Sequence, residues 1–255
     1  MINISKKLFN IRLWKSLYGS FKYNLNRKYH ELFIFNIYSS EKIFNNIWKN
    51  NYWGSEESLS GPGSTLDYTK ELRKKLPIII EKYKIKKILD APCGDLHWMQ
   101  HINFNEDVEY IGGDIVNDII EINKNKNINL LKYSFHRMDI TSDLFPKCDL
   151  WLCRAVFYHL SNHDIYRALK QFIDSNIKYI LTTNHLTDDT HVNIDILTGD
   201  WRILNLKMYP FDFPNESIEE FDDYIYPHPP ASLVLWSREQ IVPILPKLRK
   251  NLIIK

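Results

Sequence analysis

The sequence has 255 residues, a formal net charge of +2 and a mean hydropathy of −0.35. This length suffices for one sizeable α/β domain, and the near-neutral charge excludes a protein that binds polyanions over its whole surface. No apolar stretch approaches the roughly 20 residues that cross a bilayer, so we expect no transmembrane segment.

The first fifty residues are basic, with nine lysines and arginines against two glutamates. Leu8, Ile11, Trp14 and Tyr18 recur at helical spacing and predict an amphipathic helix. The basic side chains are typical of a solvated helix face, and the alternative is contact with a phosphorylated substrate or an anionic membrane surface. Because lysines and arginines interrupt the apolar residues, we expect no signal peptide.

The three cysteines, Cys93, Cys148 and Cys153, form no CxxC pair and have no metal-ligand spacing. Three isolated cysteines in a chain of this length are typical of reduced thiols. We therefore expect a cytoplasmic protein without a metal site.

Residues 55–64 are rich in Ser, Gly and Pro and predict a loop. Ser64 and Asp67 form a capping-box signal for a helix that continues through Leu76. Pro77 predicts a kink or break there. Residues 85–89 then predict the first strand of a sheet.

Acidic residues follow successive expected strands. The first strand leads into a turn that reads Asp90-Ala-Pro92-Cys-Gly94-Asp, and strands at 108–112 and 133–138 are followed by Asp114 and Asp139. A dinucleotide site needs three glycines in its first turn for backbone contact with the diphosphate, and only Gly94 is present here. Carboxylates at strand ends instead favour a ligand that offers donors and positive charge.

These segments, taken in order, resemble the motifs of class I S-adenosylmethionine-dependent methyltransferases. Residues 88–95 resemble the first motif, with Pro92 in place of its first glycine, and residues 110–116, 138–140 and 149–160 resemble the next three. The resemblance implies S-adenosyl-L-methionine as the cofactor and an α/β, Rossmann-like fold. In that fold a mostly parallel sheet has an antiparallel last strand and helices on both faces.

Residues 53–64 and 193–206 resemble flanking motifs of one bacterial subgroup that methylates capsular polysaccharide, including phosphoramidate groups. The implied reaction is O-methylation of a small phosphorylated, nucleotide-linked or glycan-precursor acceptor, with methylation of a sugar hydroxyl as the alternative. We expect a helical cap and cofactor-closing loop in residues 1–60. A methyltransferase domain would follow in 61–255, with an acceptor-site insertion at about 185–230.

The resemblance implies roles for the cofactor-binding residues. Asp90 and Gly94 would line the methionine part, Asp114 would accept the ribose hydroxyls, and Asp139 would accept the adenine amino group. Helix caps, turn acids and, for Arg154, a structural salt bridge are the alternatives. The complete expected set is Trp53, Ser60, Gly61, Ser64, Asp90, Pro92, Gly94, Asp114, Ile115, Asp139, Ile140 and Arg154.

His159 is the candidate general base, because an imidazole titrates near neutral pH, and a helix-start histidine bound to backbone is the alternative. A base is needed only for an acceptor that must lose a proton. The expected acceptor wall includes Arg202 for bidentate oxyanion capture, and a self-packed loop is the alternative. The expected acceptor-site residues are Tyr158, His185, Asp195, Trp201, Arg202 and Asn205.

The remaining elements follow in order. Ser161 and Asp164 predict a capped helix, residues 179–183 a fifth strand, and the proline-rich, aromatic residues 185–230 an irregular cover over the acceptor. A helix from about Ser237 and a final strand at 252–255 would complete the sheet. Two functions of other classes remain: a nicotinamide-dependent reductase, and a non-catalytic or nucleic-acid-binding protein, to which acids around the pocket are unsuited.

Overall fold

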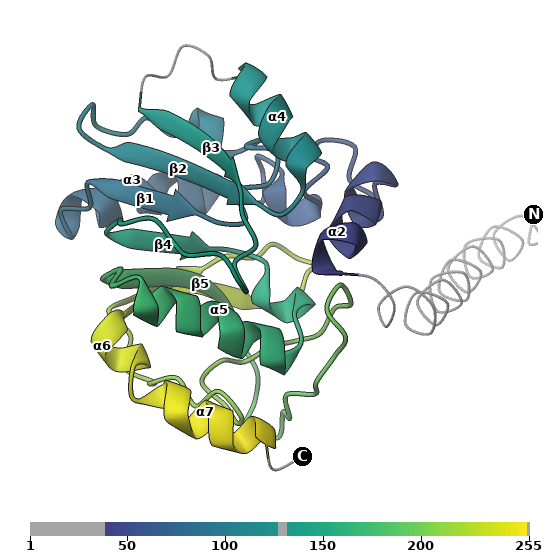
Figure 1. The fold of residues 1–255 in the computed structure, drawn as a ribbon, viewed down its shortest axis with the longest axis vertical. Helices are drawn as coiled ribbons and strands as arrows, with labels where there is room; N and C mark the ends of the chain where they lie inside the picture. Colours follow the sequence, from purple (N-terminus) through teal and green to yellow (C-terminus); the bar gives the residue numbers. More distant parts are fainter. Residues whose placement is uncertain (1–38, 127–131, 254–255) are drawn as a thin grey trace, which may run out of the picture.

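The computed structural model describes residues 39–126 and 132–253. The expected amphipathic helix around Leu8 to Tyr18, and most of the basic segment, lie outside the described residues. The described chain forms a single seven-stranded sheet with helices on both faces (Figure 1). This architecture confirms the fold class expected from the sequence.

The sheet has the strand order β3-β2-β1-β4-β5-β7-β6. All neighbouring pairs from β3 to β5 are parallel, and β7 is antiparallel to both β5 and β6. The parallel strands therefore end at one edge, which faces α2 in Figure 1. The strands are β1 (Lys87–Asp90), β2 (Glu109–Asp114), β3 (Tyr133–Arg137), β4 (Leu150–Cys153), β5 (Tyr179–His185), β6 (Glu219–Asp222) and β7 (Ala231–Ser237).

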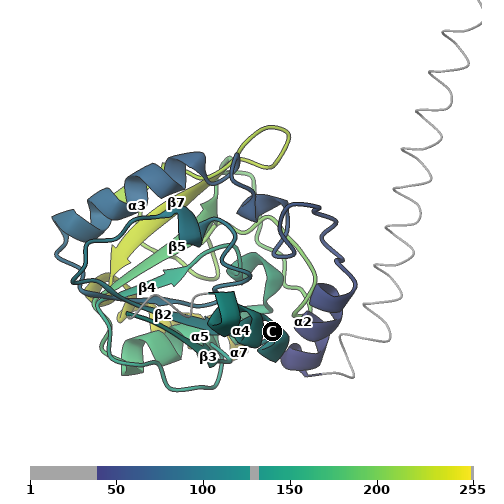
Figure 2. The same ribbon diagram turned by 90° about the horizontal axis from the view of Figure 1, so that it is seen from above.

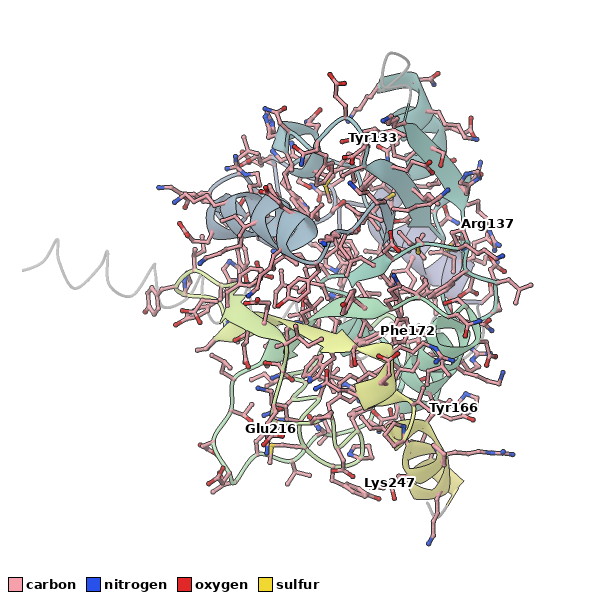
Figure 3. All side chains as sticks on the ribbon, turned by 90° about the vertical axis from the view of Figure 1, so that its left-hand side faces the viewer. Tyr133, Arg137, Tyr166, Phe172, Glu216 and Lys247 are labelled. Carbon is pink, nitrogen blue, oxygen red and sulfur yellow. The ribbon has the colours of Figure 1, made fainter. Side chains whose placement is uncertain are left out.

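Two apolar cores sandwich the sheet, because successive strand residues point to opposite faces. Leu89 and Trp151 pack on the side of α5 and α7, and Ile88 and Leu150 pack on the side of α3 (Figure 2). Phe172 of α5, labelled in Figure 3, is fully buried, and its ring centroid lies 5.8 Å from that of Trp151 in β4. The helices are α2 (Ser40–Lys49), α3 (Lys70–Lys82), α4 (Asn117–Lys126), α5 (Asn162–Asp174), α6 (Arg238–Ile241) and α7 (Ile244–Ile253), with short 3-10 helices at Pro62–Ser64, Met99–His101 and Phe157–His159.

Two predicted helix starts are confirmed. The Ser161 hydroxyl accepts from the Asp164 amide at 3.1 Å and caps α5. Ser237 and Gln240 form a reciprocal capping box at α6. Both signals are local, so the sequence alone sufficed to find them.

The prediction for α3 is wrong at its start, and the helix does not break at Pro77, where the sequence predicts a kink or break. Ser64 lies in a 3-10 helix, and α3 begins at Lys70 after Thr69. Pro77 lies inside α3 without ending it. A proline there removes a helical hydrogen bond, at a cost of about 3 kcal/mol, which burial of Leu76 and Ile79 on either side offsets.

The predicted strand at 252–255 is wrong at Leu252 and Ile253, and residues 254–255 lie outside the described residues. Leu252 and Ile253 end α7, and Leu252 packs against the core. The antiparallel strand is β7, whose first six residues are all buried. Burial on both faces removes the alternation that marks a strand. Among the described residues, the structure has no helix of sufficient length and apolar character to traverse a lipid bilayer.

Candidate active site at the carboxyl edge of the sheet

A cleft of about 1010 Å³, a volume that includes space open to solvent, lies at the edge where β1, β2 and β4 end. Ligands of open α/β sheets bind at this edge. The cleft brings together every expected cofactor residue except Gly61, and it includes His159. Gly61 packs against Trp53 instead, since an added Cβ would lie 3.3 Å from Trp53 Cβ.

The cleft acids Asp90 and Asp114 are almost completely buried at adjacent strand ends. Burial raises the pKa of Asp90 to about 7, and the Tyr110 hydroxyl, which donates to Asp90 at 2.6 Å, partly opposes this rise. Burial likewise raises the pKa of Asp114 to about 6, against hydrogen bonds from the Val116 and Gly94 amides. Desolvated carboxylates of this kind favour a ligand that carries positive charge or donors.

Asp139 follows β3, and its Oδ1 accepts from both the amide and the hydroxyl of Thr141 at 2.8 Å. These bonds leave Oδ2 without a hydrogen bond among the described residues. Ile115 and Ile140 both line the cleft near Asp139, as expected for an apolar sandwich around a flat ring.

Sequence reasoning missed the contribution of α2 to the cleft. Ser40, Phe44 and Trp48 line it, and Trp48 packs on Val116 and Ile119 at the start of α4. Helical spacing of apolar residues between 43 and 48 signals a buried face. The spacing does not reveal which surface that face covers.

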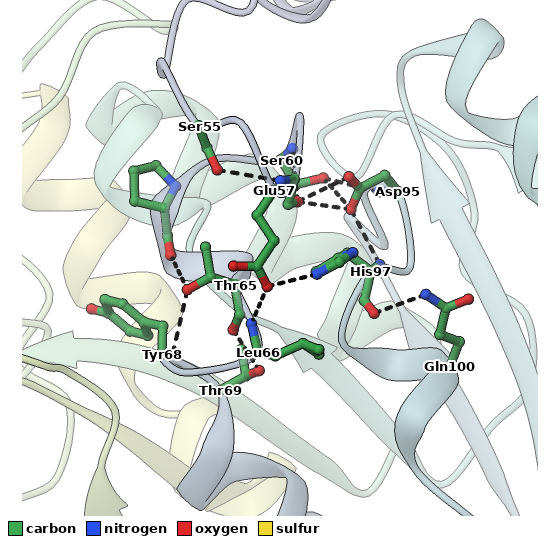
Figure 4. A network of polar contacts seen from close by, with 12 residues as sticks. Ser55, Glu57, Ser60, Thr65, Leu66, Tyr68, Thr69, Asp95, His97 and Gln100 are labelled. Atoms are coloured by element: carbon green, nitrogen blue, oxygen red, sulfur yellow. Dashed lines mark hydrogen bonds and ion pairs between the residues drawn. The ribbon is translucent and has the colours of Figure 1, made fainter.

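Residues 53–64, here called the cover loop, are fastened to the first turn by Asp95. The Asp95 carboxylate accepts from the hydroxyls of Ser58 and Ser60, at 2.9 and 3.1 Å, and from the Leu59 amide at 3.0 Å. Figure 4 shows Asp95 bonded to Ser60. The Asp95 amide donates back to Ser60 Oγ at 2.9 Å. Ser60 is therefore held by the protein itself, although it also lines the cleft.

The amides of this turn are engaged within the protein. The Gly94 amide donates to Asp114, the Asp95 amide to Ser60, and the His97 amide to the Asp95 carboxylate. Gly94 has φ +56°, and a Cβ there would collide with Ser60 Oγ, so only glycine suits the position. These three amides are therefore not available to bind a diphosphate.

Arg154 follows β4, lines the cleft and is buried. Its Nε and Nη2 donate to the two Asp223 oxygens, and Nη2 also donates to the main-chain oxygen of Gly63 in the cover loop. Burial lowers the pKa of Arg154, but the Asp223 carboxylate more than compensates, and the net shift is upward. Asp223 escaped sequence reasoning, because it lies 69 positions away.

His159 lines the cleft, and a main-chain contact fixes which of its ring nitrogens carries the hydrogen. Nδ1 lies 2.8 Å from the Asp200 carbonyl oxygen, which only accepts, so Nδ1 carries the hydrogen. Burial lowers the pKa of His159 to about 4. At neutral pH the ring is uncharged, and Nε2 carries an available lone pair.

The insertion packs directly against His159. The Gly199 amide donates to the His159 carbonyl at 2.8 Å, and the Arg202 amide donates to the Tyr158 carbonyl at 3.1 Å. A chain of neighbouring rings, with centroids 4.6 to 6.1 Å apart, leads from the cleft to the half-exposed Trp201. Its members, in order, are Trp53, His159, Tyr158, His185 and Trp201.

Arg202 does not form the expected acceptor wall. Its side chain is 1% exposed and donates to Asn162 Oδ1 and to the carbonyls of Leu160 and Ile194. These bonds occupy the guanidinium between the insertion and the start of α5, so the expected capture of an oxyanion is wrong for this structure. Asp195 lies 3.6 Å from Arg202, consistent with an orienting role.

Asn205 and His185, two other expected acceptor-site residues, form hydrogen bonds within the insertion and do not line the cleft. Asn205 donates to Thr187 Oγ1 at 2.8 Å and is buried. His185 Nδ1 accepts from the Leu204 amide at 3.1 Å, and burial lowers its pKa to about 4. Within residues 39–126 and 132–253, no three His, Cys, Asp or Glu side chains gather as a metal site would require.

The chain is similar to known proteins in its three-dimensional structure. No protein-family model matches the chain, and no curated protein matches it. Magnesium protoporphyrin IX methyltransferase from Synechocystis PCC 6803, solved with bound SAM, is similar at a TM-score of 0.55 and 9% identity, over 79% of this chain and 98% of that one. The chain has the Rossmann-like methyltransferase fold.

Two further solved structures are similar in this fold. An S-adenosylmethionine-dependent methyltransferase from Leishmania major has a TM-score of 0.56 and 13% identity, over 75% of this chain and 82% of that one. The S-adenosylmethionine-dependent methyltransferase SibL, in its apo form, has a TM-score of 0.51 and 13% identity, over 83% and 72%. At these identities the similarity establishes the fold alone.

The hydrogen bonds of Asp95 hold the cover loop against the first turn, so we expect their loss to destabilise the loop. Replacing Asp95 by Asn removes charge-assisted hydrogen bonds, so we expect about 2 kcal/mol of destabilisation. Hydrogen exchange should also accelerate at residues 58–60. Asp107→Asn is the control, because Asp107 is exposed and pairs only with Lys86 at the surface. Equal exchange in the two variants would show that Asp95 does not hold the loop.

Proposed function

We propose that the protein is an S-adenosylmethionine-dependent methyltransferase that methylates an oxygen of a small acceptor. The observation that carries the proposal is the pair of buried carboxylates, Asp90 and Asp114, at adjacent strand ends of a methyltransferase fold. Their raised pKa values and the apolar lining of the cleft suit a ligand with an ammonium group, ribose hydroxyls and an adenine ring. When bound, S-adenosylmethionine supplies a methyl group that its sulfonium already activates.

Each proposed contact uses residues of the cleft. Asp90 and Gly94 would hold the methionine part, and both oxygens of Asp114 retain a lone pair for the ribose hydroxyls. Asp139 Oδ2 would accept from the adenine amino group, with the ring between Ile115 and Ile140. Trp53 would present its aromatic face to the positive sulfur.

The first turn argues against a nicotinamide-dependent reductase. Its amides at 94, 95 and 97 already donate to Asp114, Ser60 and Asp95. A diphosphate would have to break these bonds and would meet the Asp95 carboxylate.

His159 supports a hydroxyl group as the acceptor. A neutral imidazole with its Nε2 lone pair available can take a proton from a hydroxyl, whereas an ionised phosphoramidate oxygen has no proton to lose. Burial lowers the pKa of His159 to about 4, below the near-neutral value expected from the sequence, so this imidazole is a weaker base than an exposed histidine. The ring chain from Trp53 to Trp201 offers faces for a sugar or another cyclic acceptor. Alignment of the acceptor and exclusion of water would supply most of the remaining rate enhancement.

Methylation of a phosphoramidate in capsule biosynthesis is the second candidate. It is favoured by the resemblance of residues 53–64 and 193–206 to the capsular subgroup. It would need a cation beside the acceptor, and the guanidinium of Arg202, the expected one, already donates to Asn162 and to the Leu160 carbonyl.

The direct test of the proposed function is consumption of the methyl donor across matched acceptors. Each neutral glycoside would be assayed beside its phosphorylated and phosphoramidate forms, with transfer read as S-adenosylhomocysteine release. Transfer only to the charged forms would favour the second candidate.

Asp114→Ala should abolish most of the thermal stabilisation by S-adenosylmethionine, because it removes both acceptors for the ribose hydroxyls. The measurement is the ligand-dependent shift in Tm. Asp118→Ala is the control, since Asp118 is an exposed acid at the start of the neighbouring helix α4. If Asp114→Ala kept the full ligand-dependent shift in Tm, Asp114 would not bind the cofactor.

Cofactor affinity should weaken as the pH falls from 8 to 6. The pKa values of Asp90 and Asp114 are about 7 and about 6 in the free protein, so acidification protonates both. A cationic ligand favours the ionised forms, and its binding should release protons in this range. We expect an affinity about threefold to tenfold lower at pH 6. Calorimetry in buffers of different ionisation enthalpy measures both effects, and Asp90→Asn should flatten the slope.

His159→Gln should reduce kcat by about 10²- to 10⁴-fold for a hydroxyl acceptor while leaving cofactor affinity unchanged. With a charged acceptor that carries no proton, the loss should be small. His163→Gln serves as the control, because His163 is an exposed histidine of α5. An unchanged kcat with hydroxyl acceptors would contradict the proposed base.

A further inference from the structure

Arg154 joins three segments of the chain at the edge of the cleft through its ion pair with Asp223 and its hydrogen bond to Gly63. Arg154 extends from the end of β4, Asp223 follows β6, and Gly63 belongs to the cover loop. The side chains of Arg154 and Asp223 are 5% and 3% exposed. Two charges buried this deeply need fixed geometry to remain stable, since desolvation of each is costly.

The geometry of this pair fixes the plane of the guanidinium. Nε and Nη2 each donate to one Asp223 oxygen, at 2.9 and 3.0 Å, which is a bidentate contact. The rings of Tyr68 and Trp98 each lie 5.6 Å from the guanidinium carbon. Nη2 also donates to the Gly63 carbonyl at 2.8 Å, so the same group fastens the cover loop.

The remaining nitrogen, Nη1, has no hydrogen-bond partner among the described residues, and Arg154 lines the cleft. A guanidinium held in a fixed plane with two donors unused is suited to an anionic oxygen. Asp90 and Asp114, the cleft acids nearby, repel anions. An anion that enters this cleft therefore has Arg154 as its natural partner.

We propose that Asp223 is a positioning residue, which aims Arg154 Nη1 at the carboxylate of the methionine part of the cofactor. The inference rests on the proposed function and extends it to a residue outside the cleft lining. Because Arg154 also holds Gly63, the same contact would couple recognition of the amino-acid part to closure of the cover loop.

The test compares two nucleosides that differ in the amino-acid part. S-adenosylhomocysteine carries the carboxylate, and 5′-methylthioadenosine lacks it. In Asp223→Asn the bidentate contact is lost, and we expect affinity for S-adenosylhomocysteine to fall on the order of tenfold or more. Affinity for 5′-methylthioadenosine should change less than twofold. Asp222→Asn is the matched control, because Asp222 is the exposed neighbour of Asp223, and it should alter neither affinity.

A merely structural role for Asp223 would weaken both ligands alike, and that result would overturn the proposal, as would two unchanged affinities. Arg154→Lys provides a second variant, which keeps the charge without the planar fork and should show the same selective loss. If the unmodified protein bound neither nucleoside, the proposed function itself would fail. Selective loss in the variants, with both ligands bound by the unmodified protein, supports both.

Discussion

The site depends on the burial of Asp90 and Asp114 at one edge of the sheet. Parallel pairing aligns β1 with β2, so that Asp90 lies opposite Gly112 and Asp114 ends the neighbouring strand two residues on. Buried carboxylates are costly unless they accept hydrogen bonds or meet positive charge. Tyr110 and the amides of Gly94 and Val116 satisfy part of this requirement. The carboxylate oxygens keep further capacity to accept hydrogen bonds. A ligand group with donors or positive charge is therefore the one that these carboxylates bind most favourably.

The first turn has a different role from that of a dinucleotide fold. Its amides point to Asp114, Ser60 and Asp95, and these contacts hold the turn and the cover loop together. Asp95, whose charge is unsuited to a phosphate, is therefore the centre of a polar network that shapes the cleft. Arg154 adds a second attachment of the cover loop through Gly63. The loop is thus fixed at two points, residues 58–60 and Gly63, by charged groups that follow β1 and β4.

The insertion after β5 is held by its own backbone and by the segment that follows β4. Asn193 donates to the carbonyls of Asn205 and Tyr209 within the insertion, and Arg202 donates to those of Ile194 and of Leu160, which follows β4. The segment is therefore a packed wall whose polar side chains are occupied by the protein. What it offers to an acceptor is the ring surface that leads from Trp53 to Trp201, together with the lone pair of His159.

The sequence by itself determined the features that depend on neighbours along the chain. Ser161 and Ser237 signal helix caps, and the acids after the parallel strands mark the cleft, because a strand end and a cap are local patterns. The tertiary structure alone decided which charges remain available. Arg202 and Arg154 look equivalent in sequence, yet the guanidinium of Arg202 is occupied by Asn162, Leu160 and Ile194, whereas Arg154 pairs with Asp223 at the cleft. The strand β7 was likewise decided by the fold, since burial on both faces erases the alternation that identifies a strand. Side-chain partners and burial are properties of the packed chain, and local spacing carries no record of them.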